Sequence, residues 1–179
     1  MSSENRTSVP NSLNEHWMPF TSNKDFKANP RLITEAKGVY LKTHHGKTQI
    51  DASSGLFCNP LGHGRKEITE AVTKQLEILD YAQPFQQGFG GSFELATRIS
   101  KHTPGDLNKM FFTICGSTAV ETAIKIAVAY HRAKGDAQRF RFVGRERGYH
   151  GMNIGCVSVG GMVNNVKTFA SILMPGVQH

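Results

Sequence analysis

The feature that most constrains this chain is an apolar run that passes through a turn of small residues into a long amphipathic segment. Met110–Ile114 is short and rich in Phe and Ile, which is typical of a buried β-strand. The turn is Cys115-Gly116-Ser117, and the Ala-rich segment that follows it, up to Tyr130, has apolar residues at helical spacing. Thr118 and Glu121 have the spacing of a capping box, so we expect the helix to begin at Thr118.

A strand that enters a helix through Gly-Ser-Thr leaves unpaired backbone N–H groups at the helix start, which makes the turn a candidate phosphate site. Turn and capping chemistry alone select the same residue types in any α/β protein, so this alternative stays open at this point. The turn matches neither of the sharper phosphate motifs, Gly-x-x-x-x-Gly-Lys-Ser/Thr and Gly-x-Gly-x-x-Gly.

A second turn of the same kind follows further along the chain. Arg139–Val143 is predicted to be the next strand, which gives strand–helix–strand and hence a parallel pair with Met110–Ile114. Gly148-Tyr149-His150-Gly151 then lies at the C-terminal end of a strand, where α/β proteins bind ligands. We therefore expect the two turns to open on the same side of one sheet. No closing element is evident from Asn164 onward, so the chain is predicted to be a truncated part of a longer protein.

The rest of the chain divides into a tail, an arm with a hairpin, and helical segments. Residues 1–12 are predicted to be a disordered tail, because they are polar and have almost nothing to bury. Residues 13–60 contain a predicted β-hairpin, with Val39–Thr43 and Thr48–Asp51 joined by a loop that includes a glycine. Residues 61–179 form the first part of an α/β domain. Helices are expected at about 65–79 and about 92–101.

Composition and cysteine usage narrow the class of protein. The chain is 39% hydrophobic and 20% charged, has no apolar run of the roughly 20 residues that span a bilayer, and has a polar N-terminus. This predicts a cytoplasmic protein without a membrane segment. Cys58, Cys115 and Cys156 contain no Cys-x-x-Cys pair, so they are expected to be reduced, mostly buried, and not metal ligands.

The net charge of +7 permits binding to nucleic acid or to acidic ligands. The Lys and Arg residues are scattered, and the densest group is Arg139, Arg141, Arg145 and Arg147. This distribution favours a solvated surface with some ligand or subunit contacts, and no nucleic-acid partner.

Taken in order, the motifs of this chain resemble those of the class III aminotransferases, and within them the omega-amino acid–pyruvate (β-alanine–pyruvate) transaminases. The likeness runs from about Asn11 to Gly176. The segments that carry it are His16–Phe20, Phe26–Arg31, Gly62–Ile68, Pro104–Leu107, Gly116-Ser117 with Glu121, and Gly144–Gly151.

The resemblance implies a pyridoxal 5′-phosphate enzyme with the aspartate aminotransferase-like fold (fold type I), which has a mostly parallel sheet with flanking helices. It assigns residues 13–60 to the small domain and residues 61–179 to the large, cofactor-binding domain. Gly116 and Ser117 match residues that bind the cofactor phosphate, and Tyr149 matches the aromatic residue that stacks on the pyridine ring.

The resemblance also implies a substrate pocket for an amine or amino acid donor and pyruvate, lined by Trp17, Phe20, Phe57 and Phe85. For Trp17, Phe20 and Phe85, packing within the protein's own core remains an open alternative. Relatives often have Trp where this chain has Phe57, which implies a wider pocket.

The family's Schiff-base lysine, its pyridine-nitrogen aspartate and its carboxylate-binding arginine match positions beyond residue 179. We therefore expect this chain alone to be inactive, and the full-length protein to be a homodimer or tetramer. The alternatives are another class III enzyme such as an aminomutase, or a non-catalytic basic binding fragment.

Overall fold

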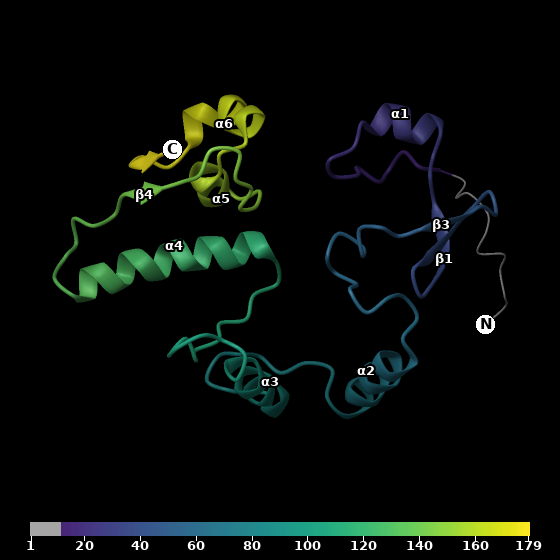
Figure 1. Cartoon of the computed structure of the whole chain (residues 1–179), viewed down its shortest axis with the longest axis horizontal. Coiled ribbons are helices and arrows are strands. Elements are labelled where there is room, and N and C mark those ends of the chain that lie inside the picture. Colours follow the sequence, from purple (N-terminus) through teal and green to yellow (C-terminus); the bar gives the residue numbers. More distant parts are fainter. Residues whose placement is uncertain (1–11) are drawn as a thin grey trace. The chain divides into compact units, whose positions relative to one another are not determined.

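The computed structural model describes residues 12–179, which form two compact units (Figure 1). The first unit ends at Gly88, and the second runs Phe89–His179. The predicted disordered tail, 1–12, lies outside the described residues except for Ser12. Within 12–179, no helix is long and apolar enough to cross a membrane.

The first unit is built on a three-stranded antiparallel sheet in the order β1-β2-β3. The strands are β1 (Ile33–Lys37), β2 (Tyr40–Thr43) and β3 (Thr48–Ile50). The predicted hairpin is confirmed, since Tyr40 lies opposite Ile50 in the register of β2 and β3. Gly46 has φ +78° in the connecting loop, a conformation that glycine adopts without steric cost.

Two helices complete the first unit, α1 (Asn23–Ala28) and α2 (Lys66–Ile78). The predicted helix at 65–79 is confirmed to within one residue at each end. Its apolar positions Ile68, Val72 and Leu76 follow helical spacing, yet each is about half exposed. Among the described residues, α2 therefore has an apolar face that nothing buries.

The second unit is mainly helical and has its core at a short helix, α5 (Ile154–Val159), which packs against α4 (Gly116–Ala133). Cys156, Val157 and Ser158 of α5 are buried. The buried Ser158 hydroxyl is satisfied, because it donates to the Ile154 carbonyl at 2.6 Å and accepts the Met174 N–H at 2.8 Å. The other elements are α3 (Gly90–Ser100), which confirms the predicted helix at 92–101, α6 (Val163–Phe169), a 3-10 turn (Ala170–Ile172), β4 (Phe142–Val143) and β5 (Val177–Gln178).

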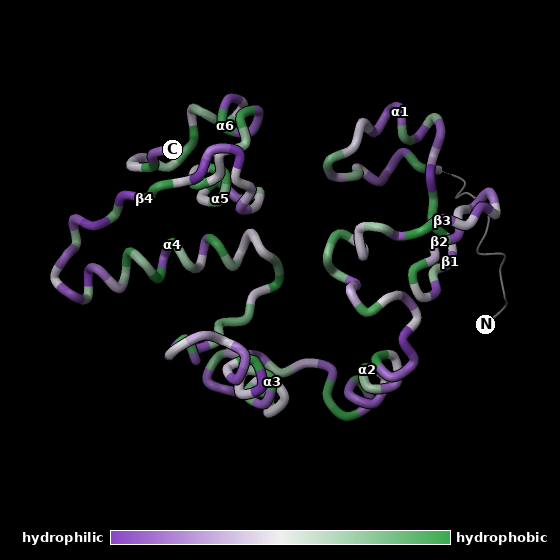
Figure 2. Tube along the Cα trace, in the orientation of Figure 1, coloured by the Kyte–Doolittle hydropathy of each residue, from purple (hydrophilic) through white to green (hydrophobic). Residues whose placement is uncertain are grey.

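The predicted strand Met110–Ile114 is wrong for the described residues. The segment leads into α4 without strand structure, and no described residue pairs with it in a ladder. The tube before α4 has hydrophobic colouring in Figure 2, and the apolar side chains of this segment stay exposed: Phe111 is 70% and Ile114 is 94% exposed. A strand requires a hydrogen-bonded neighbour, and an apolar run alone does not provide one.

The predicted parallel pairing of Arg139–Val143 with Met110–Ile114 is also wrong. The strand expected at Arg139–Val143 is confined to β4, which pairs in parallel with β5. The segment from Asn164 onward, expected to contain no closing element, contains most of α6 and then β5. β5 lies beside β4, with Phe142 opposite Val177.

Two smaller predictions also fail. The helix begins at Gly116, with Cys115 as its N-cap residue, and not at Thr118. The Glu121 carboxylate accepts the Gly155 N–H at 2.8 Å, so a tertiary contact takes the place of the expected capping box. The three cysteines are free, as expected, but only Cys156 is buried, whereas Cys58 and Cys115 are exposed.

Candidate functional site

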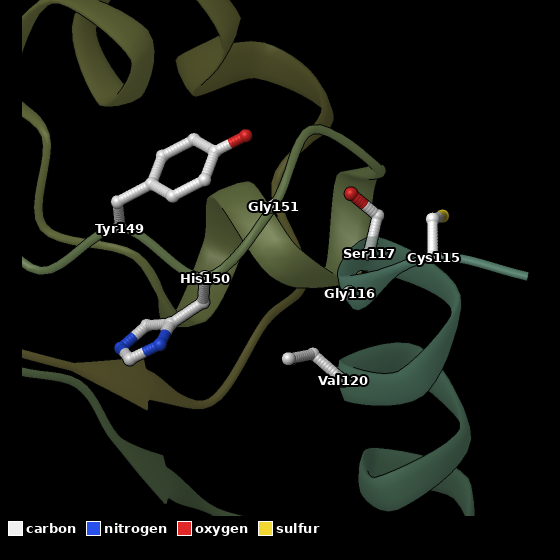
Figure 3. A pocket seen from close by; sticks show the side chains of 7 residues that line it. All are labelled: Cys115, Gly116, Ser117, Val120, Tyr149, His150 and Gly151. Atoms are coloured by element: carbon white, nitrogen blue, oxygen red, sulfur yellow. The ribbon is translucent and has the colours of Figure 1, made fainter. Parts of the chain in front are cut away.

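A pocket of about 460 Å³ lies at the N-terminal end of α4 (Figure 3). One wall comes from the start of the helix and the other from the loop that precedes α5. The lining residues are Cys115, Gly116, Ser117 and Val120 from the helix start, and Tyr149, His150 and Gly151 from the loop. The structure thus brings together the three residues matched to cofactor binding, Gly116, Ser117 and Tyr149, and places the two predicted turns against each other.

Three hydrogen bonds fasten the loop and α5 to the start of α4. Ser117 Oγ accepts the Met152 N–H at 3.0 Å, and the Ser117 carbonyl accepts the Cys156 thiol at 3.1 Å. One turn further along, Glu121 Oε1 accepts the Gly155 N–H at 2.8 Å. Because Ser117 Oγ acts as the acceptor for Met152, its own hydroxyl proton remains to be donated to a ligand.

Gly151 is the point of closest approach between the loop and the helix. It has φ +123°, and a Cβ at this position would lie 2.5 Å from Ser117 Oγ and 3.0 Å from Cys156 Sγ. Such distances are too short for any side chain. Glycine at this position is therefore what allows the loop to lie directly on the first turn of α4.

The helix start stabilises negative charge. The N–H groups of the first turn have no carbonyl of their own helix to bind, and the dipole of this 18-residue helix places partial positive charge there. The Thr118 hydroxyl, followed by the Thr118 N–H, lowers the pKa of the exposed Cys115 thiol. The Ser117 N–H acts in the same direction. The same donors suit a phosphate group, so the residues present fit this part of a phosphorylated cofactor.

The pKa of the buried Cys156 thiol, behind the pocket, shifts in the opposite direction. Burial, and then the negative charge of Glu121, raise the pKa of Cys156. The thiol therefore stays protonated and donates to the Ser117 carbonyl. Cys156 and Glu121 act as supports of the helix start, whose own donors remain directed to the pocket.

Tyr149 and His150 are the exposed side chains of the loop wall. Figure 3 shows their rings on opposite sides of the loop backbone, and places Gly151 between the Tyr149 ring and Ser117. Tyr149 is 59% exposed, so a face of its ring is available to a planar ligand. His150 and Cys115 were not predicted as lining residues, although both lie inside the two turns that the sequence singles out.

The predicted substrate-pocket residues, Trp17, Phe20, Phe57 and Phe85, all belong to the first unit. All four are at least 78% exposed, so none of them packs into a core in the part of the chain that the structure describes. Phe20 borders a separate pocket of about 350 Å³ together with Asp25 and Arg31. Their contact with a substrate stays a prediction.

Residues 21–179 match the class III aminotransferase family. The chain belongs to this family. In the described residues, no cluster of three His, Cys, Asp or Glu side chains could hold a metal ion.

Curated relatives of this class III aminotransferase chain include two with closely related names. It is 46% identical over 169 residues to the omega-aminotransferase of Caulobacter vibrioides, covering 94% of this chain and 38% of that protein. It is 49% identical over 167 residues to the omega-amino acid–pyruvate aminotransferase of Pseudomonas putida, covering 93% of this chain and 37% of that protein. The class III chain thus spans little more than a third of the length of these relatives, and matches their N-terminal part.

Solved structures show the same fold. A thermostable (S)-enantioselective omega-transaminase from Thermomicrobium roseum superposes with a TM-score of 0.87 at 32% identity, covering 92% of this chain and 37% of that one. The adenosylmethionine-8-amino-7-oxononanoate aminotransferase of Methanocaldococcus jannaschii gives 0.86 at 35% identity, covering 91% and 37%. The class III chain therefore has the α/β architecture of the N-terminal part of a fold type I transaminase, as the sequence predicts.

Proposed function

We propose that this chain is the N-terminal part of a pyridoxal 5′-phosphate-dependent aminotransferase that moves an amino group from an omega-amino acid or amine to pyruvate. The observation that carries the proposal is the pocket at the start of α4. It combines the unpaired N–H groups of a long helix, the Ser117 hydroxyl and the ring of Tyr149. The Pseudomonas putida relative, which is named for omega-amino acids and pyruvate, supports the choice of substrates.

In this proposal the residues of the pocket bind and orient the cofactor. When bound, pyridoxal 5′-phosphate supplies the carbonyl that receives the amino group and the ring that withdraws electrons from the substrate. The N–H groups of Gly116 and Ser117 donate to its phosphate, and the Ser117 hydroxyl adds a third donor. Tyr149 would offer an aromatic face to the ring and keep water from that side of it.

The remaining assignments concern residues outside this pocket and the complete protein. We assign Trp17, Phe20, Phe57 and Phe85 to the substrate pocket, where aromatic side chains suit the carbon chain of an amine donor. We assign residues 13–60 to the small domain and residues 61–179 to the large domain. The complete protein is proposed to be a homodimer or a dimer-based tetramer.

The test uses the protein expressed with all residues that its gene encodes, and compares it with residues 1–179 alone. We expect the complete protein to form alanine from β-alanine and pyruvate, because we assign the Schiff-base lysine to a later part of the protein and no lysine within 1–179 matches its position. We expect no alanine from 1–179 with added cofactor.

Omitting pyruvate is the control. A product in which the amino group has moved within the donor, without pyruvate, would favour an aminomutase. Alanine formation by 1–179 alone would contradict the assignment of the catalytic lysine to a later part of the protein.

A further inference from the structure

The loop that carries Phe57 contains a short left-handed turn. Four consecutive residues have positive φ: Ser54 51°, Gly55 59°, Leu56 55° and Phe57 68°. Residues other than glycine adopt this region rarely and usually singly, because Cβ approaches the next carbonyl. A run that includes Ser, Leu and Phe persists where surrounding contacts enforce it, and such strain gathers at functional sites.

Asp51 holds the entry to this turn. Its side chain is only 7% exposed and accepts three hydrogen bonds from the loop. Oδ1 accepts the Ser53 N–H at 3.2 Å and the Ser53 hydroxyl at 3.0 Å, and Oδ2 accepts the Gly55 N–H at 2.8 Å. The carboxylate thus lies against the first residues of the turn and fixes their backbone.

His63 lies at the C-terminal end of the loop and binds Asp51 at the N-terminal end. Its Nε2 lies 3.0 Å from Asp51 Oδ2, and its Nδ1 lies 2.7 Å from Asn59 Nδ2. The Asn59 amide donates to Nδ1, so Nε2 carries the proton that is donated to Asp51. One neutral tautomer satisfies both contacts. Asn59 also belongs to the turn, because its N–H donates to the Ser54 carbonyl at 2.9 Å.

Both ends of the loop are fixed to the antiparallel sheet. The Asp51 N–H donates to the Val39 carbonyl at 2.8 Å. The His63 backbone exchanges two bonds with Gly38, at 2.8 and 2.9 Å. The side-chain pair Asp51–His63 therefore closes the neck of a loop whose two ends already rest on the turn between β1 and β2.

The loop displays apolar side chains, and its one hydroxyl in the network, that of Ser53, donates to Asp51 and has no hydrogen bond to His63. Phe57 is 84% exposed and Leu56 is 73% exposed, so the loop presents apolar surface instead of burying it. Both ring nitrogens of His63 are engaged by Asp51 and Asn59, which leaves the imidazole no partner for acid–base work. These contacts therefore support the structure of the loop that exposes Leu56 and Phe57.

We propose that Asp51, His63 and Asn59 are positioning residues that hold the 53–62 loop in its left-handed form and thereby fix Phe57 against the carbon chain of the amine donor. The proposal rests on the proposed function, which assigns Phe57 to the substrate pocket. The three residues act through Phe57 and do not contact the reacting atoms.

The first measurement is hydrogen–deuterium exchange of the loop amides in the complete protein. In Asp51→Asn, the amide N–H₂ cannot accept the bonds from Gly55 and His63, so we expect the amides of residues 55–59 to exchange about ten-fold faster or more. Asp106→Asn, the same change at an exposed carboxyl in the second unit, is the matched control and should leave their exchange unchanged. Unchanged exchange in Asp51→Asn would overturn the proposal.

The second measurement separates positioning from general damage. Asp51→Asn and His63→Gln are expected to raise KM for an amine with a long apolar chain about ten-fold, with a smaller change in kcat and in cofactor affinity. Phe57→Ala should raise KM similarly without changing loop exchange. The double variant Asp51→Asn/Phe57→Ala should then show little further increase, because Asp51 acts through Phe57.

Additive effects on KM, or faster exchange with an unchanged KM, would overturn the role in substrate binding. If the complete wild-type protein transfers no amino group from any amine, the proposed function fails together with that role. The exchange result would still decide whether the network holds the loop.

Discussion

Replacing Gly151 by alanine is expected to destabilise the protein by about 2–6 kcal/mol and to abolish tight cofactor binding. The new methyl group would lie 2.5 Å from Ser117 Oγ and 2.8 Å from Ser117 Cα, so the loop must move away from the start of α4. Overpacking costs about 1–3 kcal/mol, and an L-residue at φ +123° adds about 1–3 kcal/mol of backbone strain. Urea unfolding of the complete protein measures the loss.

Gly135→Ala is the matched control for this substitution. Gly135 also has a positive φ, +86°, but no described atom lies within 4 Å of its ideal Cβ. Its replacement should therefore cost only the backbone strain, about 1–2 kcal/mol, and leave cofactor affinity unchanged. Equal losses at the two positions would show that the contact between Gly151 and Ser117 has no special role.

Ser117→Ala is expected to weaken pyridoxal 5′-phosphate binding about ten- to hundred-fold. A hydrogen bond to a charged group contributes about 1.5–3 kcal/mol, and the substitution removes the hydroxyl donor from the phosphate site. It also removes the acceptor of the Met152 N–H, which fastens the loop that carries Tyr149. Equilibrium titration of the complete apoprotein with the cofactor measures the change.

Ser100→Ala provides the control, because Ser100 lies in α3 and its hydroxyl bonds to the Thr97 carbonyl, away from the pocket. Its cofactor affinity should equal that of the wild type. If the Ser117→Ala variant has wild-type affinity for the cofactor, Ser117 serves only as a residue of the turn.

The parts of the structure that were predictable from the sequence are those set by local chemistry. Helical spacing of apolar residues predicted α2 to within one residue, and alternation around a glycine-containing loop predicted the β2–β3 hairpin. The small residues at Gly116 and Ser117 predicted a helix start with unpaired N–H groups. The pocket brings this start together with Tyr149.

The parts that were mispredicted depend on distant partners. Met110–Ile114 has the composition of a strand, but a ladder needs a neighbour, and none of the described residues supplies one. Glu121 has capping-box spacing, but its carboxylate is taken by the Gly155 N–H, 34 residues away. In the first case the distant partner is missing, and in the second a tertiary contact overrides the local preference.

The left-handed turn at 54–57 is a third example of this dependence. Three of its four residues are not glycine, so no local rule predicts their positive φ. The contact that closes the loop joins Asp51 to His63, 12 residues apart. From the sequence, the segment that contains this turn was recognisable only as a loop that is rich in Gly and Pro and carries large apolar residues.

Large apolar side chains stay exposed in two segments of the second unit. Ile114 is 94% exposed and Val143 is 84% exposed, so each leaves apolar surface uncovered in the part of the chain that the structure describes. The described chain spans little more than a third of its relatives. The residues of the proposed phosphate site nonetheless all lie within it.

The most direct test of the central claim is to titrate the complete apoprotein with pyridoxal 5′-phosphate and with pyridoxal, which lacks the phosphate. If the start of α4 binds the phosphate, the wild type prefers the phosphorylated ligand strongly. Ser117→Ala then loses about ten- to hundred-fold in affinity for that ligand, and clearly less for pyridoxal, which is affected only through the loop that carries Tyr149. An equal loss for both ligands, or no preference in the wild type, would contradict the assignment of the phosphate to Gly116 and Ser117.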